Sequence, residues 1–313
     1  MAATQAPIVR RRGIPKSVLA ENLWAYLFIL PWILGFVLIE VGPVLASFAL
    51  SFTNFDIVTP IAQTDFVGLK NYDKMLFNDP LFWHSLKVTA IFSVGSVILG
   101  IIFGVILALM LNQNLRGIAF YRTIFFTPAV VAGVAVAYMW YWVLHKEAGI
   151  VNTVLRYVGI EGPNWLFNYE LALPTFIFMN LWALGGGTVI YLAALQGVPT
   201  QLYEAAEIDG AGWPAKTWNV TIPMISPAIF FNLIMGIIGS FQVFINSFVI
   251  TSGGPANATL FYVLYLYEKA FRSLKMGYAS SLSVALFLII MVLTILAFAM
   301  SGRWVYYEGE LKK

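Results

Sequence analysis

A polar segment between two apolar stretches carries the residues best suited to binding chemistry. Residues 196–224 read QGVPTQLYEAAEIDGAGWPAKTWNVTIPM. Glu204 is followed by Ala205 and Ala206, whose small side chains permit close backbone approach, while the carboxylate can pair with a basic residue of a partner protein. In the alternative interpretation the segment is a solvated loop whose acids only maintain solubility. The residues alone leave both interpretations open.

Turn and helix signals divide this segment into two helical pieces. Pro199 suits a helix start, residues 202–209 favour a short helix, and Gly210 suits the turn that ends it. A second helical piece is predicted from Pro214, ending before Pro223.

A second candidate site lies in the next apolar stretch. Residues at spacings of four, three, four and three are predicted to share one helix face: Asn232, Gly236, Gly239, Val243 and Asn246. Ser240 and Gln242 flank this face. Amides in hydrocarbon need partners, so the face either lines a path for a hydroxyl-bearing solute or bonds to neighbouring helices. We favour the path for Ser240 and Gln242 and leave Asn232 open.

An earlier apolar stretch adds Trp182 and the triplet Gly185, Gly186 and Gly187 to the candidate pathway. Glycine weakens helix preference and exposes the backbone, which predicts a kink or a close approach of solute near Gly186. Trp182 can stack on a sugar face, although packing is the commoner role of an aromatic in a membrane helix.

Other kinds of chemistry lack residues to carry them. The chain has no cysteine, and no nucleophile, metal-ligand set or acid–base constellation is recognisable, so we expect neither an enzyme nor a metal site. The apolar stretches hold no series of acids, His or Lys suited to an ion relay. A net charge of +3 gives no indication of nucleic-acid binding.

The composition shows where these residues must be positioned. With 60% hydrophobic and 11% charged residues and a mean hydropathy of +0.82, the chain is predicted to be an all-α polytopic membrane protein. About 20 apolar residues cross a bilayer. The predicted spans are Leu23–Ile39, Val88–Leu111, Thr123–Leu144, Leu173–Leu195, Pro227–Ile250 and Ser281–Met300.

The basic cluster before the first span indicates orientation. Arg10, Arg11, Arg12 and Lys16 favour a cytoplasmic N-terminus, and an even number of spans returns the C-terminus to the same side. A cleaved signal is disfavoured because the first apolar stretch is long. The outer loops over residues 54–83 and 145–172 are expected to be folded, and residues 260–274 to form an amphipathic helix at the outer membrane interface.

The spacing in the polar segment resembles a known signature. Glu204-Ala205-Ala206, Gly210 and Pro223 match the EAA-x3-G-x9-I-x-L-P pattern of ABC importer permeases, with conservative changes at Val220 and Ile222. Further segments resemble the carbohydrate permeases related to the maltose permease subunit MalF: residues 66–72 (FVGLKNY), 79–83 (DPLFW), 253–255 (GGP), 266–271 (LYEKAF) and 277–280 (GYAS).

The resemblance implies a type I ABC importer transmembrane domain in a bacterial plasma (inner) membrane. Its coupling loop would dock on ATPase subunits through Glu204, Ala205, Ala206, Asp209, Gly210 and Pro223. The chain lacks a phosphate-binding loop, so ATP and Mg²⁺ would lie on two partner ATPases. A second, MalG-like permease subunit in a heterodimer, an extracellular solute-binding protein and a sugar substrate complete the implied assembly.

The implied organisation has a cytoplasmic tail over residues 1–21, a permease domain over 22–303 with the coupling loop at 197–225, and a cytoplasmic tail over 304–313. The competing interpretations are an ion-coupled carrier or channel that works alone and a membrane scaffold with no pathway. A carrier would transport without ATPase partners, and a scaffold would leave the small and polar stripe of residues 232–246 without a purpose.

Overall fold

A computed structural model describes residues 16–113 and 115–306 of the chain. The basic cluster at residues 10–12 and the end of the predicted C-terminal tail lie outside the described residues. Apart from an isolated β-bridge between Thr53 and Phe66, the regular structure of the described residues is helical. The prediction of an all-α protein is confirmed.

In the described part of the chain, three helices are long and apolar enough to cross a membrane: Asn22–Leu50, Pro80–Leu111 (α4) and Met276–Ser301 (α15). Three further spans are helix pairs bent by 102°, 48° and 65°: Ile118–Val130 with Gly133–Val143, Ala172–Ala183 with Gly185–Gln196, and Trp213–Met224 with Ser226–Phe241. With each bent pair counted as one span, the described residues hold the six spans that the hydropathy pattern predicts.

The first span consists of α1 (Lys16–Gly35), a π-helical turn η1 (Phe36–Val41) and α2 (Gly42–Leu50). The bent spans consist of α5 (Ile118–Phe126), η3 (Thr127–Val130) and α6 (Gly133–Val143), then α8 (Ala172–Asn180), η4 (Leu181–Ala183) and α9 (Gly185–Gln196), then α11 (Trp213–Lys216), η5 (Thr217–Thr221), α12 (Ile222–Met224) and α13 (Ser226–Phe241). The remaining elements are η2 (Ile61–Gln63), α3 (Lys70–Phe77), α7 (Ile150–Tyr157), α10 (Thr200–Ile208), η6 (Ser247–Thr251), α14 (Tyr262–Tyr267) and η7 (Glu268–Arg272).

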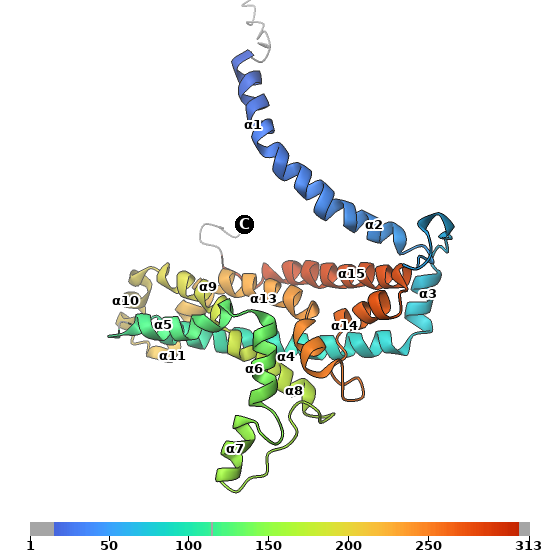
Figure 1. Ribbon diagram of the computed structural model, residues 1–313. Helices are drawn as coiled ribbons and strands as arrows, with labels where there is room; N and C mark the ends of the chain where they lie inside the picture. The colour runs from blue at the N-terminus through green and yellow to red at the C-terminus, as the bar shows by residue number, and fades with distance from the viewer. Residues whose placement is uncertain (1–15, 114, 307–313) are drawn as a thin grey trace, which may run out of the picture.

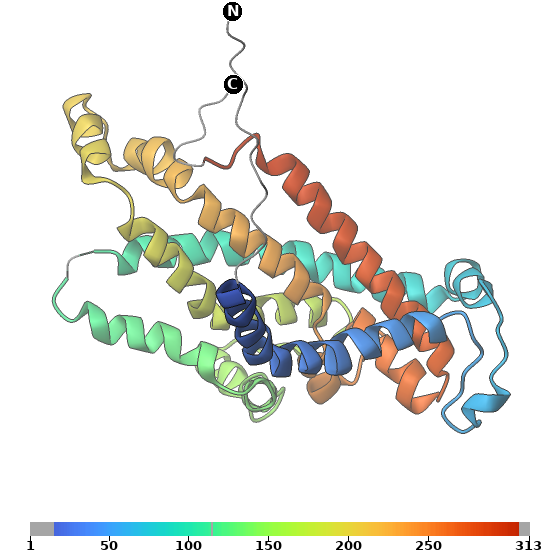
Figure 2. The same ribbon diagram turned by 90° about the horizontal axis from the view of Figure 1, so that it is seen from above.

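Helix α4 is the centre of the bundle and packs against α8, α9 and α13. Helices α4, α13 and α15 run along the bundle's long axis, with α10 and α11 at one end and α3 and α14 at the other (Figures 1 and 2). We call these the inner and outer ends, following the predicted orientation. The first span ends at the outer end, where α2 packs on α15, whereas α1 points away from the bundle (Figure 1).

Several span boundaries differ from the predicted ones. The first span continues past Ile39 to Leu50 because Pro43 occupies the first turn of α2, where its missing N–H is tolerated. The second begins at Pro80 rather than Val88, since the Asp79 carboxylate caps α4 by accepting hydrogen bonds from the backbone N–H groups of Leu81 and Phe82.

The third predicted span is not one continuous helix. After the 3₁₀ turn at Thr127–Val130, Ala132 takes an extended ψ of 132°, and α6 turns away from α5 by 102°. The second helical piece of the inner loop also differs from the prediction, because it continues through Pro223 to Met224. The preceding π-helical turn has i→i+5 hydrogen bonds, which accommodates a residue that lacks an N–H.

The amphipathic helix expected at the outer interface is instead part of the core. Residues 262–272 are helical, as predicted. Phe261, Tyr262 and Leu264 are nevertheless fully buried, and α14 packs between α4 and α15. The outer loops are folded, as predicted. For example, the buried amide of Asn152 on α7 accepts a hydrogen bond from the Trp165 indole at 2.7 Å.

Candidate functional site

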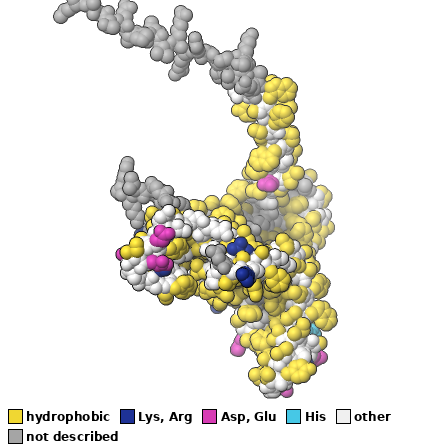
Figure 3. Space-filling view, turned by 90° about the vertical axis from the view of Figure 1, so that its left-hand side faces the viewer, with side chains coloured by type: hydrophobic (Ala, Val, Ile, Leu, Met, Phe, Trp, Pro, Cys, Tyr) yellow, Lys and Arg dark blue, Asp and Glu magenta, His cyan; other side chains and the backbone are white. Residues whose placement is uncertain are grey.

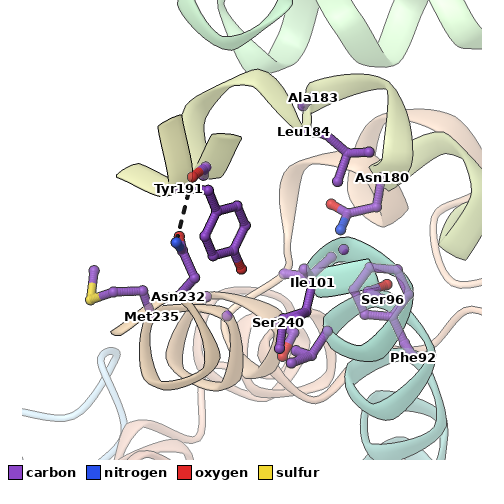
Figure 4. A pocket seen from close by; sticks show the side chains of 16 residues that line it. Phe92, Ser96, Ile101, Asn180, Ala183, Leu184, Tyr191, Asn232, Met235 and Ser240 are labelled. Carbon is purple, nitrogen blue, oxygen red and sulfur yellow. Dashed lines mark hydrogen bonds between the residues drawn. The ribbon is translucent and has the colours of Figure 1, made fainter. Parts of the chain in front are cut away.

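A cavity of about 280 Å³ lies within the bundle, between α4, the bent pair α8–α9 and α13. Its uncharged polar lining residues are Ser96, Asn180, Tyr191, Asn232 and Ser240 (Figure 4). No Lys, Arg, Asp or Glu is among the residues that line it. Neutral hydrogen-bonding groups between apolar walls suit a solute that carries hydroxyl groups and no charge.

Four of the predicted pathway residues line this cavity: Gly236, Gly239, Ser240 and Val243. The Ser240 hydroxyl is bonded to the Ser93 hydroxyl on α4 at 2.6 Å, so it joins two helices as well as lining the space. Asn232 likewise combines both interpretations, since it lines the cavity and its amide bonds to the Gly187 carbonyl on α9 at 3.4 Å.

The structure places the other predicted pathway residues away from this cavity. Helix α13 ends at Phe241, so the expected single helical face through Val243 and Asn246 does not exist. Glycines lower helix preference in the last turns, and the break allows Phe241 and Phe244 to pack in the outer core. Gln242 is exposed at the helix end and Asn246 is half-buried beyond the break. Trp182 packs edge-on against Trp140 at 6.3 Å.

The three glycines of the triplet occupy different environments. A Cβ on Gly185 would lie 2.2 Å from the Phe125 carbonyl oxygen, and one on Gly187 would lie 3.0 Å from the Asn232 amide oxygen. A Cβ on Gly186 would make only an ordinary 3.8 Å contact with Ala129. The predicted kink is present as the 48° bend before Gly185, and close helix packing requires the first glycine rather than Gly186.

The helix α10 projects at the inner end and presents the residues of the polar segment. Glu204, Ala205 and Asp209 are exposed and Ala206 is half-buried. Figure 3 looks onto this end, where acidic side chains lie on the projecting part. Gly210 has a φ of 77°, a left-handed conformation that glycine adopts without strain.

Two backbone hydrogen bonds, from Gly210 and from Ala211, close the end of α10. The Gly210 N–H donates to the Glu207 carbonyl at 3.0 Å and the Ala211 N–H donates to the Ala206 carbonyl at 2.8 Å. This pairing is a Schellman motif, which terminates a helix sharply. The glycine of the signature therefore fixes where α10 ends and where the chain turns back toward the membrane.

Two side-chain contacts attach α10 to the returning segment. The Lys216 ammonium pairs with the Glu207 carboxylate at 2.5 Å, and the Tyr203 and Thr221 hydroxyls are 3.1 Å apart. The returning segment passes through Pro223 in α12 and joins α13 at a 65° bend. These contacts therefore connect α10 to a helix that lines the cavity.

Comparison with known proteins agrees with this arrangement. The family model described as "Binding-protein-dependent transport system inner membrane component" matches residues 100–305. The chain belongs to this family of ABC transporter permeases. The probable ABC transporter permease protein YesP of Bacillus subtilis is 38% identical over 299 residues, covering 94% of this chain and 96% of that protein.

The names of other relatives include sugars. The trehalose/maltose transport system permease protein MalF of Thermococcus litoralis is 33% identical over 276 residues, covering 88% of this permease and 92% of that protein. A crystal structure of a bacterial ABC transporter involved in the import of the acidic polysaccharide alginate contains a chain with a TM-score of 0.80 and 23% identity, with 92% of this chain and 98% of that chain covered. This permease thus has the fold of an ABC importer transmembrane domain and belongs among the sugar permeases.

Sequence reasoning missed three polar residues that line the cavity of this permease: Ser96, Asn180 and Tyr191. Ser96 and Gly100 stand four residues apart on α4, a small-residue spacing that resembles the one on α13 and could have indicated a common face. Asn180 ends α8, and a lone amide in an apolar stretch was a further signal. The Ser96 hydroxyl is buried and has no hydrogen-bond partner within residues 16–113 and 115–306.

A carboxylate fixes the outer end of the permease. Asp79 is partly buried, which opposes its ionisation, but hydrogen bonds from the hydroxyls of Tyr265 and Tyr278 and the nearby charge of Lys269 hold its pKa below the ordinary value. Burial and the same hydrogen bond raise the pKa of Tyr265. This cluster joins α4, α14 and α15 and so fixes the helix whose middle lines the cavity.

Proposed function

We propose that this chain is a permease subunit of an ATP-driven importer that moves a sugar or oligosaccharide across the plasma membrane by alternating access. The observation that carries the proposal is the continuous structural connection between α10 and the cavity. The exposed Glu204 helix is attached through Lys216 and Tyr203 to the segment that becomes α13, and α13 lines a neutral cavity. Closure of partner ATPases would move α10 and thereby change the access of the cavity.

In this proposal Glu204, Ala205, Ala206, Asp209, Gly210 and Pro223 form the coupling region for two ATPase subunits, which hold ATP and Mg²⁺. The relatives' names, which include arabinooligosaccharides and trehalose/maltose, support a saccharide substrate. Hydroxyls of the solute would bond to Ser96, Asn180 and Asn232. A second permease subunit would complete the pathway, and an extracellular binding protein would deliver the solute. Both termini would be cytoplasmic.

Purification of the tagged chain from its native membrane, compared with a Glu204→Lys variant, tests the proposal. We expect the native chain to bring down an ATPase and a second permease, and Glu204→Lys to lose at least nine-tenths of the ATPase because the reversed charge meets a basic partner. Glu161→Lys is the matched control, since Glu161 is exposed in the outer loop. A native chain that binds no ATPase and transports alone in liposomes would instead establish a self-sufficient carrier.

A further inference from the structure

The first span contains one charged side chain in an otherwise apolar helix. From Asn22 to Leu50 the sequence reads NLWAYLFILPWILGFVLIEVGPVLASFAL, in which Glu40 is the only charged residue. A carboxylate within a membrane-spanning helix is energetically unfavourable unless it is paired, and such residues usually mark a functional contact.

The contacts at the outer end indicate the depth of Glu40. The Gly277 N–H donates to the Phe55 carbonyl at 2.8 Å, and the Asn71 amide donates to the Ser51 carbonyl at 2.9 Å. The first contact joins the loop after α2 to the start of α15, and the second joins the end of α2 to α3, so the first span ends at the outer end of the bundle. Glu40 precedes Leu50 by ten residues (50 − 40), which at 1.5 Å per residue is about 15 Å. Because the first span runs obliquely to α15 (Figure 1), Glu40 lies at a smaller depth than this below the outer end, but still within the roughly 30 Å hydrocarbon layer.

No other described residue neutralises this carboxylate. The ion pairs within residues 16–113 and 115–306 are Lys216–Glu207 and Arg272–Glu268. The Glu40 side chain is exposed, and no residue in the most apolar window of the first span is buried. In Figure 1, α1 points away from the bundle, and within the described residues the main contacts of η1, which holds Glu40, are with its own neighbours α1 and α2.

The backbone around Glu40 is also irregular. Glu40 lies in η1, a π-helical turn between two α-helical halves, and a Cβ on Gly42 would lie 3.3 Å from the Val37 carbonyl oxygen. Single π-helical turns in α-helices occur frequently at functional sites. The charge and the backbone irregularity therefore fall on the same turn of the helix.

We infer that Glu40 forms an intramembrane ion pair with a Lys or Arg side chain of the second permease subunit, and that this contact holds the two permeases together. A basic side chain of a partner protein is the neighbour that would complement the Glu40 charge. Lipid tails offer no hydrogen-bond donor, and the described part of this chain offers none nearby. The inference rests on the proposed two-permease assembly.

The complete transporter, with the tag on this chain, tests the inference by co-purification. We expect Glu40→Leu to reduce the retained second permease at least tenfold, Glu40→Lys to reduce it further, and Glu40→Gln to have an intermediate effect because it keeps a hydrogen-bonding group without the charge. Ile39→Leu, a volume-conserving change on the neighbouring residue, should leave retention unchanged. The amount of tagged chain in the membrane controls for insertion.

A crosslink identifies the neighbour directly. The chain has no cysteine, so Val44→Cys, one turn from Glu40, can carry a photo-crosslinker at a single site, with Leu38→Cys on the other face as control. We expect the second permease in the Val44→Cys adduct. Full retention by Glu40→Leu, or an adduct with lipid only, would overturn the inference while leaving the proposed function standing. A native chain that retains no second permease would overturn both.

Discussion

At the residue scale, glycines with the same sequence signal have unlike roles. Gly185 packs against the Phe125 backbone, whereas a Cβ on Gly239 would meet nothing within 4 Å and Gly239 borders the cavity. The sequence predicted the candidate residues, but it could not separate packing from lining, because that distinction depends on which helix lies opposite. Ser96 was missed although Thr89, Ser93, Ser96, Gly100 and Gly104 recur at helical spacing, and Asn180 was missed because it is a lone amide in an apolar stretch.

The two glycines therefore predict opposite phenotypes. Gly185→Ala should destabilise the permease by about 1–3 kcal/mol, the typical result of forcing a methyl group into a packed site, and lower its melting temperature in detergent. Gly239→Ala should leave the melting temperature unchanged and reduce sugar uptake, since its methyl group enters the cavity. Gly186→Ala, with an ordinary 3.8 Å contact, is the control and should change neither. Equal melting temperatures for all three would contradict this account.

At the element scale, the number and order of spans followed from hydropathy, whereas their breaks did not. The sequence does not show what each proline does. The chain turns by 102° after Pro128 but stays helical through Pro223. Tertiary packing decides such cases, because a freed carbonyl is tolerated only where neighbours satisfy it. Residues 260–274 show the same limit, since an amphipathic pattern is compatible with either an interface or a core.

A buried hydroxyl bridges the bend between α12 and α13. Ser226, 2% exposed, donates to the Pro223 carbonyl at 2.6 Å and accepts from the Tyr306 N–H at 2.8 Å. It thus joins the end of the coupling segment to the residues that follow α15. The chain crosses this bend between the inner helix α10 and the cavity, so the hydroxyl should keep the two parts moving together.

Removing the Ser226 hydroxyl should weaken the coupling between movement of α10 and access to the cavity. In Ser226→Ala the half-buried Pro223 carbonyl and the Tyr306 N–H lose this hydrogen-bond partner, a change of about 0.5–1.5 kcal/mol. We expect the ATPase to stay bound and sugar uptake per ATP hydrolysed to fall severalfold in proteoliposomes. Ser283→Ala is the control, because the Ser283 hydroxyl bonds only within its own helix, to the Ala279 carbonyl at 3.1 Å. A parallel decline in both variants would mean that Ser226 is merely structural.

At the scale of the whole molecule, the fold places the candidate coupling surface and the C-terminal end of α15 at the same end of the bundle (Figure 2). Tyr306 contacts Ser226 there, whereas α3 and α14 lie at the opposite end. Basic residues occur at both ends, among them Arg116, Arg122 and Lys216 at one and Lys74, Lys269 and Arg272 at the other. The side that faces the cytoplasm therefore depends mainly on the N-terminal basic cluster, since residues flanking the first helix usually dominate orientation.

Single cysteines can determine this orientation, because the chain has none of its own. Glu161→Cys in the outer loop should react with a membrane-impermeant maleimide in intact cells, and Asp209→Cys beside α10 should react only after the membrane is opened. Both positions are exposed, so burial cannot explain a difference between them. Equal labelling after permeabilisation is the control for reactivity. The reversed pattern would put α10 outside the cell, out of reach of any cytoplasmic ATPase, and would contradict both the orientation and the proposed coupling role of Glu204.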